Sequence, residues 1–159
     1  MHLRVHRLRN EAFENPVTKS RFADMFRGIW SRRDAGAEVR IRLINVTRQV
    51  EIADCIEIAD KGERRRKGLL GRSGLATGEG LWIVPCEAVH TFGMKFPIDL
   101  VYLDRTNRVV KTRSHVGPGR LSACLSARSV VELPSGTVQG KVIQRGDILE
   151  LMRVPACRS

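Results

Sequence analysis

From Val39 onward, apolar residues recur at every second position, which is typical of half-buried β-strands. Val39, Ile41 and Leu43 alternate with arginines, and the pattern returns over residues 50–52 and 56–58. These segments predict a hairpin-like pair of strands. Further strands are predicted, between turns that contain Pro or Gly, at residues 81–84, 98–103, 109–113, 129–133 and 148–154.

One short helix interrupts this series of strands. Residues 61–70 are rich in charge and are typical of a helical turn or short helix, whereas the glycine-rich residues 71–80 indicate a loop. Many short strands at close spacing, with little helix, favour packed β-layers or a barrel. The sequence therefore predicts a small, mainly β, antiparallel sandwich or barrel over residues 39–154, followed by a C-terminal tail at residues 155–159.

Residues 1–38 have a different pattern and are predicted to form a basic, partly helical N-terminal extension. The segment is rich in arginine, and residues 31–37 follow neither period, as expected of a linker. Apolar side chains occur at the spacing of one helical face at Phe22, Met25, Phe26, Ile29 and Trp30. Such a face suits an anionic membrane surface or a partner groove. A helix docked on its own domain, or a frayed extension, is the favoured alternative.

The composition limits the class of protein. The chain has 159 residues and a net charge of +11, and its apolar runs are far shorter than the roughly 20 residues that span a bilayer. The N-terminus lacks the order of a secretory signal. We therefore expect a cytoplasmic protein, at most peripheral to a membrane. Cys55, Cys86, Cys124 and Cys157 are widely spaced and are expected to be free thiols.

Positive charge is concentrated in residues 61–72, which hold six Lys or Arg against one Glu. A solvated helix face is the favoured explanation, and an electrostatic surface for nucleic acid or anionic lipid is the alternative. The chain has five Phe, two Trp and one Tyr, and no recognised nucleic-acid motif. Sequence-specific nucleic-acid binding is therefore not expected.

The segment from Cys86 to Asp99 is the densest in reactive side chains. Cys86, His90 and Met94 have a C-x3-H-x3-M spacing that resembles the copper loop of cupredoxins, although the second histidine of such a site is missing upstream. Alternatively, Cys86 is a nucleophile, with His90 as its base and Asp99 orienting the imidazole. The favoured interpretation is a core-and-turn segment without this chemistry. No cofactor is expected, and copper or zinc at Cys86, His90 and Met94 is the alternative.

Several glycine-containing motifs follow one another over about residues 50–151. In chain order they are Gly68-Leu-Leu-Gly-Arg72, Gly78-Glu-Gly-Leu-Trp82, His90-Thr-Phe-Gly-Met94-Lys-Phe-Pro-Ile-Asp-Leu100 with Val101-Tyr-Leu-Asp104, Val131-Glu-Leu-Pro-Ser-Gly136 and Gly146-Asp-Ile-Leu149. This series resembles the family called domain of unknown function 192, whose members commonly show an aromatic residue paired with Met, as Trp-Met, where this chain has Phe92-Gly93-Met94. The resemblance implies a small, mainly β, sandwich-like domain of bacteria and archaea, often exported, and no established reaction.

Arg72 lies in the part of the chain that resembles this family, beside glycine-rich turns whose amides suit an anion. An ion pair with a carboxylate such as Asp99 or Glu132, or bonds to loop carbonyls, are the favoured alternative.

We expect a non-enzymatic binding or accessory module for an anionic ligand or a protein partner. The candidate ligand-binding residues are Arg72, His90, Met94 and Asp99. Two alternatives remain open. One is a metal-binding or thiol-dependent protein that uses Cys86 and His90. The other is a peripheral membrane or assembly factor that uses Phe22, Phe26, Ile29 and Trp30.

Overall fold

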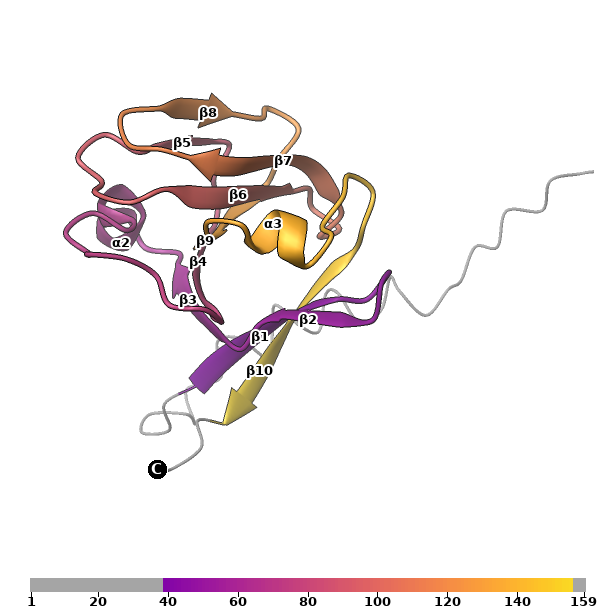
Figure 1. Ribbon diagram of the computed structural model, residues 1–159. Helices are drawn as coiled ribbons and strands as arrows, with labels where there is room; N and C mark the ends of the chain where they lie inside the picture. Colours follow the sequence, from indigo (N-terminus) through magenta and orange to yellow (C-terminus); the bar gives the residue numbers. More distant parts are fainter. Residues whose placement is uncertain (1–38, 156–159) are drawn as a thin grey trace, which may run out of the picture. The chain divides into compact units, whose positions relative to one another are not determined.

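The computed structural model describes residues 39–155, which form three β-sheets and two short helices (Figure 1). The largest sheet has the strand order β3, β4, β9, β6 and β7, which are Cys55–Ala59, Glu79–Ile83, Ser129–Pro134, Ile98–Leu103 and Val109–Val116. The second has the order β10, β1 and β2, which are Leu149–Pro155, Val39–Asn45 and Val50–Ala53. The third sheet pairs β5, Ala88–His90, with β8, Leu121–Ala123. The helices are α2, Gly62–Lys67, and α3, Thr137–Gly140.

The described residues are mainly β, as the sequence predicts, and their strands form open sheets and no closed barrel. β1 and β2 form an antiparallel hairpin in which Asn45 lies opposite Val50. β3 leaves this sheet and pairs in parallel with β4, because the connection through residues 60–78 is long enough to return the chain to the same end of the sheet. α2 lies in that connection. The four-residue α3 was not predicted, since it is too short to show a helical period.

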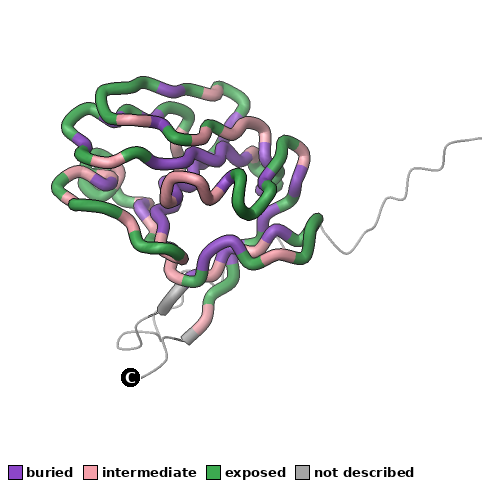
Figure 2. The backbone as a smooth tube through the Cα atoms, in the orientation of Figure 1, coloured by how far each residue is buried: buried purple, intermediate pink, exposed green. Residues whose placement is uncertain are grey.

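The five-stranded sheet is covered on both faces, so β6 and β9 are buried at nearly every position (Figure 2). The first core, on one face, includes Leu43, Val101, Val131, Leu133 and Val138. The second core, on the other face, includes Leu69, Leu81, Val89, Leu100 and Val130. Side chains alternate between the two faces of a strand. Glu132 therefore shares the face of Val130 and belongs to the side of the second core.

Residues 1–38 and 156–159 lie outside the described residues. The predicted N-terminal helix, with its membrane-facing Phe22, Phe26, Ile29 and Trp30, falls there, and so does most of the predicted tail. The domain boundary after residue 38 stays a prediction. Within residues 39–155, no helix is long and apolar enough to cross a membrane.

Candidate functional site

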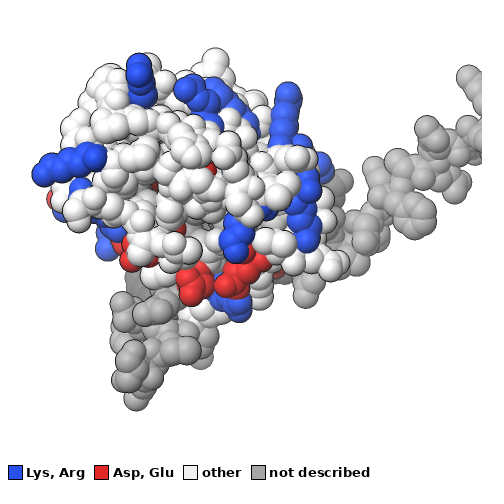
Figure 3. Space-filling model, viewed as in Figure 1, with Lys and Arg blue, Asp and Glu red and all other residues white. Residues whose placement is uncertain are grey.

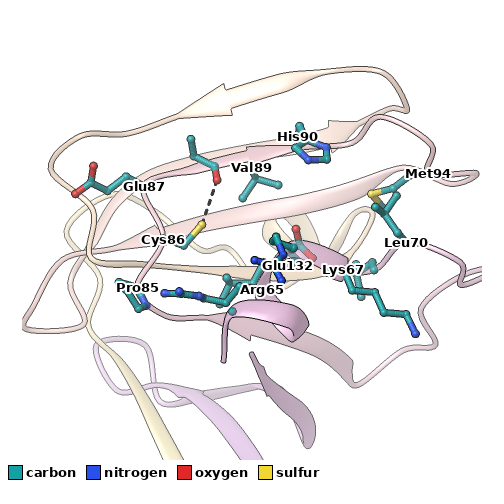
Figure 4. Close-up of a pocket in the computed structure, with 16 residues that line it drawn as sticks. Arg65, Lys67, Leu70, Pro85, Cys86, Glu87, Val89, His90, Met94 and Glu132 are labelled. Carbon is teal, nitrogen blue, oxygen red and sulfur yellow. Dashed lines mark hydrogen bonds between the residues drawn. The ribbon is translucent and has the colours of Figure 1, made fainter. Parts of the chain in front are cut away.

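A cavity of about 320 Å³ opens beside the second core (Figure 4). One wall consists of α2 and the turn that follows it, within residues 62–70. The other wall consists of residues 85–90, which lead into and form β5, together with Ile83 and Met94. Glu132 of β9 also lines the cavity. The β3–β4 connection and the small β5–β8 sheet thus enclose a space against a central strand of the large sheet.

Glu132 places a buried carboxyl group at this cavity. The residue is 3% exposed, and its Oε2 atom has no hydrogen-bond partner among residues 39–155. It lies opposite Leu81 of β4 and Leu100 of β6, so its cross-strand neighbours offer apolar side chains. Burial raises the pKa of Glu132 to about 7, while the positive charge of Arg72 acts in the opposite direction. At neutral pH the group is therefore divided between its neutral and charged forms.

The α2 wall supplies positive charge. Arg65, Arg66 and Lys67 line the cavity, whereas Arg64 is turned toward β3, where it donates to the Ile58 carbonyl oxygen at 3.4 Å. Elsewhere, basic side chains lie at separate places over the face of the domain shown in Figure 3. Within the basic cluster, the side of α2 that faces the cavity is therefore the part that lies on a concave surface. Cationic side chains at a cavity wall attract anions.

Cys86 lines the cavity and is half-buried. Its Sγ donates to the carbonyl oxygen of Ala88 at 3.2 Å. Burial is the main cause that raises the pKa of the Cys86 thiol, and the nearby charge of Glu132 acts in the same direction. A catalytic cysteine requires the opposite shift, because the thiolate is the nucleophile. The environment of Cys86 therefore favours a protonated thiol at neutral pH.

His90 and Met94, two of the four predicted ligand-binding residues, also line the cavity. His90 is exposed, and its ring stacks on that of Phe92 with the centroids 5.5 Å apart. Met94 is 8% exposed and packs in the second core. Cys86 and Met94 lie toward opposite ends of the cavity in Figure 4.

Within residues 39–155, no three His, Cys, Asp or Glu side chains are grouped so that they could hold a metal ion. Because that grouping does not count Met, copper or zinc at Cys86, His90 and Met94 stays a prediction.

The other two predicted ligand-binding residues are absent from the cavity lining. Arg72 forms an ion pair with Glu57 of β3, at 2.7 Å, so its carboxylate partner is neither Asp99 nor Glu132. Asp99 is fully buried on β6. Its Oδ1 accepts from the backbone N–H of His115 at 2.8 Å, and its Oδ2 from that of Val138 at 2.7 Å. Asp99 thereby holds β7 and α3 against β6, while Arg72 reaches the site only through its charge.

Sequence reasoning missed Glu132 as a site residue. Its signal was present, since Ser129-Val-Val-Glu-Leu-Pro134 is a strand with one charged residue inside an apolar run. A strand buried on both faces has no solvated position for a carboxylate. Such a residue needs either a protein partner or a ligand.

The family model for DUF192, described as "Uncharacterized ACR", matches residues 44–151. The chain belongs to the DUF192 family. The match begins at the end of β1, ends within β10 and includes both walls of the cavity and Glu132. No curated protein matches the chain.

Solved structures with the same fold come from two bacteria. A protein from Sinorhizobium meliloti 1021, described as a "putative transcription regulator", is 21% identical with a TM-score of 0.63, over 74% of this chain and 97% of that one. A protein of unknown function from Novosphingobium aromaticivorans DSM 12444 is 18% identical with a TM-score of 0.61, over 76% of this chain and 91% of that one. At these identities the likeness shows the shared β fold of the DUF192 domain.

Proposed function

We propose that this DUF192 domain is a non-enzymatic binding module for a small molecule with a negatively charged group. The observation that carries the proposal is the composition of the cavity, where the cationic side chains of α2 share one space with a buried carboxyl group whose Oε2 atom has no hydrogen-bond partner among residues 39–155. The volume of about 320 Å³ is at the small end of ligand pockets, which span about 300–1,000 Å³. A ligand of metabolite size fits such a space.

The negatively charged group of the ligand is assigned to the α2 wall. Arg65, Arg66 and Lys67 reach the cavity from a short helix whose remaining arginine, Arg64, is turned toward β3. A charge-assisted hydrogen bond to a guanidinium or ammonium group is about twice as strong as one between neutral groups. His90, at the far wall, adds a second polar contact, while Met94 adds apolar contact area.

Titration with two simple anions, butyrate and inorganic phosphate, tests this proposal. Backbone amide NMR spectra of the full chain should show saturable shifts in residues 62–70 and 85–94, with a dissociation constant of about 1 mM for the better probe. The double variant Arg65→Gln/Lys67→Gln should weaken that binding about tenfold.

The matched control is Lys61→Gln/Arg64→Gln, which removes two positive charges from the same helical segment at positions outside the cavity lining. It should leave the affinity within about twofold of the parent. Shifts that map to other surfaces, or equal losses in the two double variants, would contradict binding in the cavity.

Glu132 also favours a second candidate function, an enzyme that uses this carboxyl group as a general acid or base. Its pKa of about 7 is the value that such catalysis requires near neutral pH. Binding is preferred because the one thiol in the cavity is held protonated and no activated nucleophile accompanies Glu132 in the lining. A bound compound that is recovered chemically changed after incubation would reverse this preference.

A further inference from the structure

The cavity has an ordered polarity that restricts its ligand further. Its floor offers the unpartnered Oε2 atom of Glu132. The apolar side chain of Val89 lies near its centre in Figure 4, and those of Leu70 and Met94 lie together toward one end. Its α2 wall offers the cations Arg65 and Lys67.

A buried acceptor without a partner costs roughly 1–3 kcal/mol. Two other buried carboxylates avoid that cost. Asp99 accepts from two backbone N–H groups. Asp147 accepts from Asn45, Arg48 and the backbone of Gln144. Glu132 differs because it lines the cavity, where no described residue donates to its Oε2 atom.

We infer that the cavity takes a small zwitterion of the amino-acid class, whose primary ammonium group donates to Glu132 and whose carboxylate faces the cationic α2 wall. This inference rests on the proposed function and adds the second charged group of the ligand. An ammonium group carries three donors and a positive charge, so it satisfies Oε2 and compensates a buried negative charge at once. The apolar walls fit the methylene groups between the two charges.

The charges around Glu132 fix the sign of the pH dependence. Arg72 stabilises the charged carboxylate, and Arg65, Arg66 and Lys67 lie on the α2 wall. Cys86, Glu87 and His90 line the opposite wall. Since the pKa of Glu132 is about 7, the ammonium group meets a carboxylate above pH 7 and a neutral acid below it. Affinity for the zwitterion should fall by up to tenfold per pH unit below 7.

The test compares each amino acid with the carboxylate that lacks its amine. The probes are glycine, 3-aminopropionate, 4-aminobutyrate and 6-aminohexanoate, against acetate, propionate, butyrate and hexanoate, titrated into the full chain at pH 8 and pH 6. At least one amino acid should bind about tenfold more tightly than its partner at pH 8. That advantage should vanish at pH 6. The simple carboxylates should bind more tightly at pH 6 than at pH 8, because a protonated Glu132 does not repel them.

Glu132→Gln should reduce the advantage at pH 8 to about onefold, while the exposed control Glu150→Gln retains it. Thermal unfolding of both variants checks that they are folded, and the pH profile of the unaltered protein gives a second readout that needs no variant. If carboxylates bind in the cavity and no amine improves on them, the zwitterion inference is overturned and the proposed function stands. If no probe of either series binds there, the zwitterion inference is overturned, and if inorganic phosphate also fails to bind, the proposed function is overturned with it.

Discussion

The two faces of the five-stranded sheet treat a buried carboxyl group in opposite ways. On the first-core face, Asp99 has each oxygen occupied by a backbone N–H, from His115 and from Val138. On the second-core face, Glu132 is buried to nearly the same degree, yet its Oε2 has no partner among the described residues. The first face is closed by protein, and the second opens into the cavity.

This difference separates a structural carboxylate from a candidate site. Backbone donors are fixed by the fold, so Asp99 gains its hydrogen bonds whenever β7 and α3 are in place. The Oε2 atom of Glu132 gains no such bond from the described residues, and the desolvation cost of the carboxylate raises the pKa of Glu132. The Oε2 atom of Glu132 is therefore a hydrogen-bond acceptor that is available to a ligand.

The largest effect is expected from Asp99→Ala, which would leave two buried N–H groups without acceptors. The free energy of unfolding should fall by about 2–5 kcal/mol, because each lost partner costs about 1–3 kcal/mol. Urea denaturation at pH 7 measures it, with the exposed Glu150→Ala as a control that should change by less than about 0.5 kcal/mol. A loss below 1 kcal/mol would remove the contrast between the two faces.

Glu132→Gln sharpens the contrast from the other side. A carboxyl group that titrates near 4.5 when unfolded and near 7 when folded binds more protons in the folded state between those values. The protonated carboxyl group of Glu132 therefore contributes its full stabilisation of the folded state below about pH 4.5. This contribution, about 3 kcal/mol in total, is lost as the pH rises through 7. The stability of the parent should fall by that amount relative to the variant between pH 4.5 and pH 8. Parallel curves for the two proteins would rule out the raised pKa.

Arg72→Gln should raise the pKa of Glu132 above its parent value, since the guanidinium of Arg72 is the charge that lowers it. An NMR titration of the Glu132 side-chain carboxyl carbon measures this shift. Glu57→Gln is the matched control, because it breaks the same ion pair and leaves the positive charge in place. Stability should change by no more than about 1 kcal/mol in either variant, as for other exposed pairs. Equal pKa values in both variants would show that Arg72 does not act on the cavity floor.

The smallest effect concerns Cys86. Its raised pKa predicts slower alkylation by iodoacetamide at pH 8 than for a free cysteine, since less thiolate is present. Mass spectrometry of the Cys86 peptide follows the reaction, and the same protein unfolded in urea supplies the reference rate. A native rate above the unfolded one would restore the thiol-dependent alternative.

Much of the sheet could be predicted because each long strand carries its own local pattern. Residues 98–103 were predicted as a strand and are β6 without a shift at either end. The β5–β8 pair escaped prediction because each strand has three residues, too few to show alternation. The parallel pairing of β3 with β4 also escaped, since strand order depends on contacts between distant segments that no local period reveals.

The candidate site was predicted only in part for a related reason. Cys86, His90 and Met94 stand out by residue type, and the cavity does collect them. Asp99 also stood out, but its partners at His115 and Val138 are 16 and 39 residues away in the sequence. The sequence suggested Glu132 only as a carboxylate partner for Arg72, because its position between β4 and β6 depends on pairings that no local pattern reveals.

The connection between the parallel strands β3 and β4 carries one wall of the cavity, whereas the sheet is formed by residues elsewhere in the sequence. The connection through residues 60–78 must exist for the pairing to form, but its length and charges are not set by any strand register. Doubling a loop costs only about 0.6 kcal/mol in closure entropy. Mutation can therefore change the cationic wall with little effect on folding, whereas Glu132 is part of the central strand β9. Descendants of one ancestral domain can diverge in what they recognise and still keep the same fold.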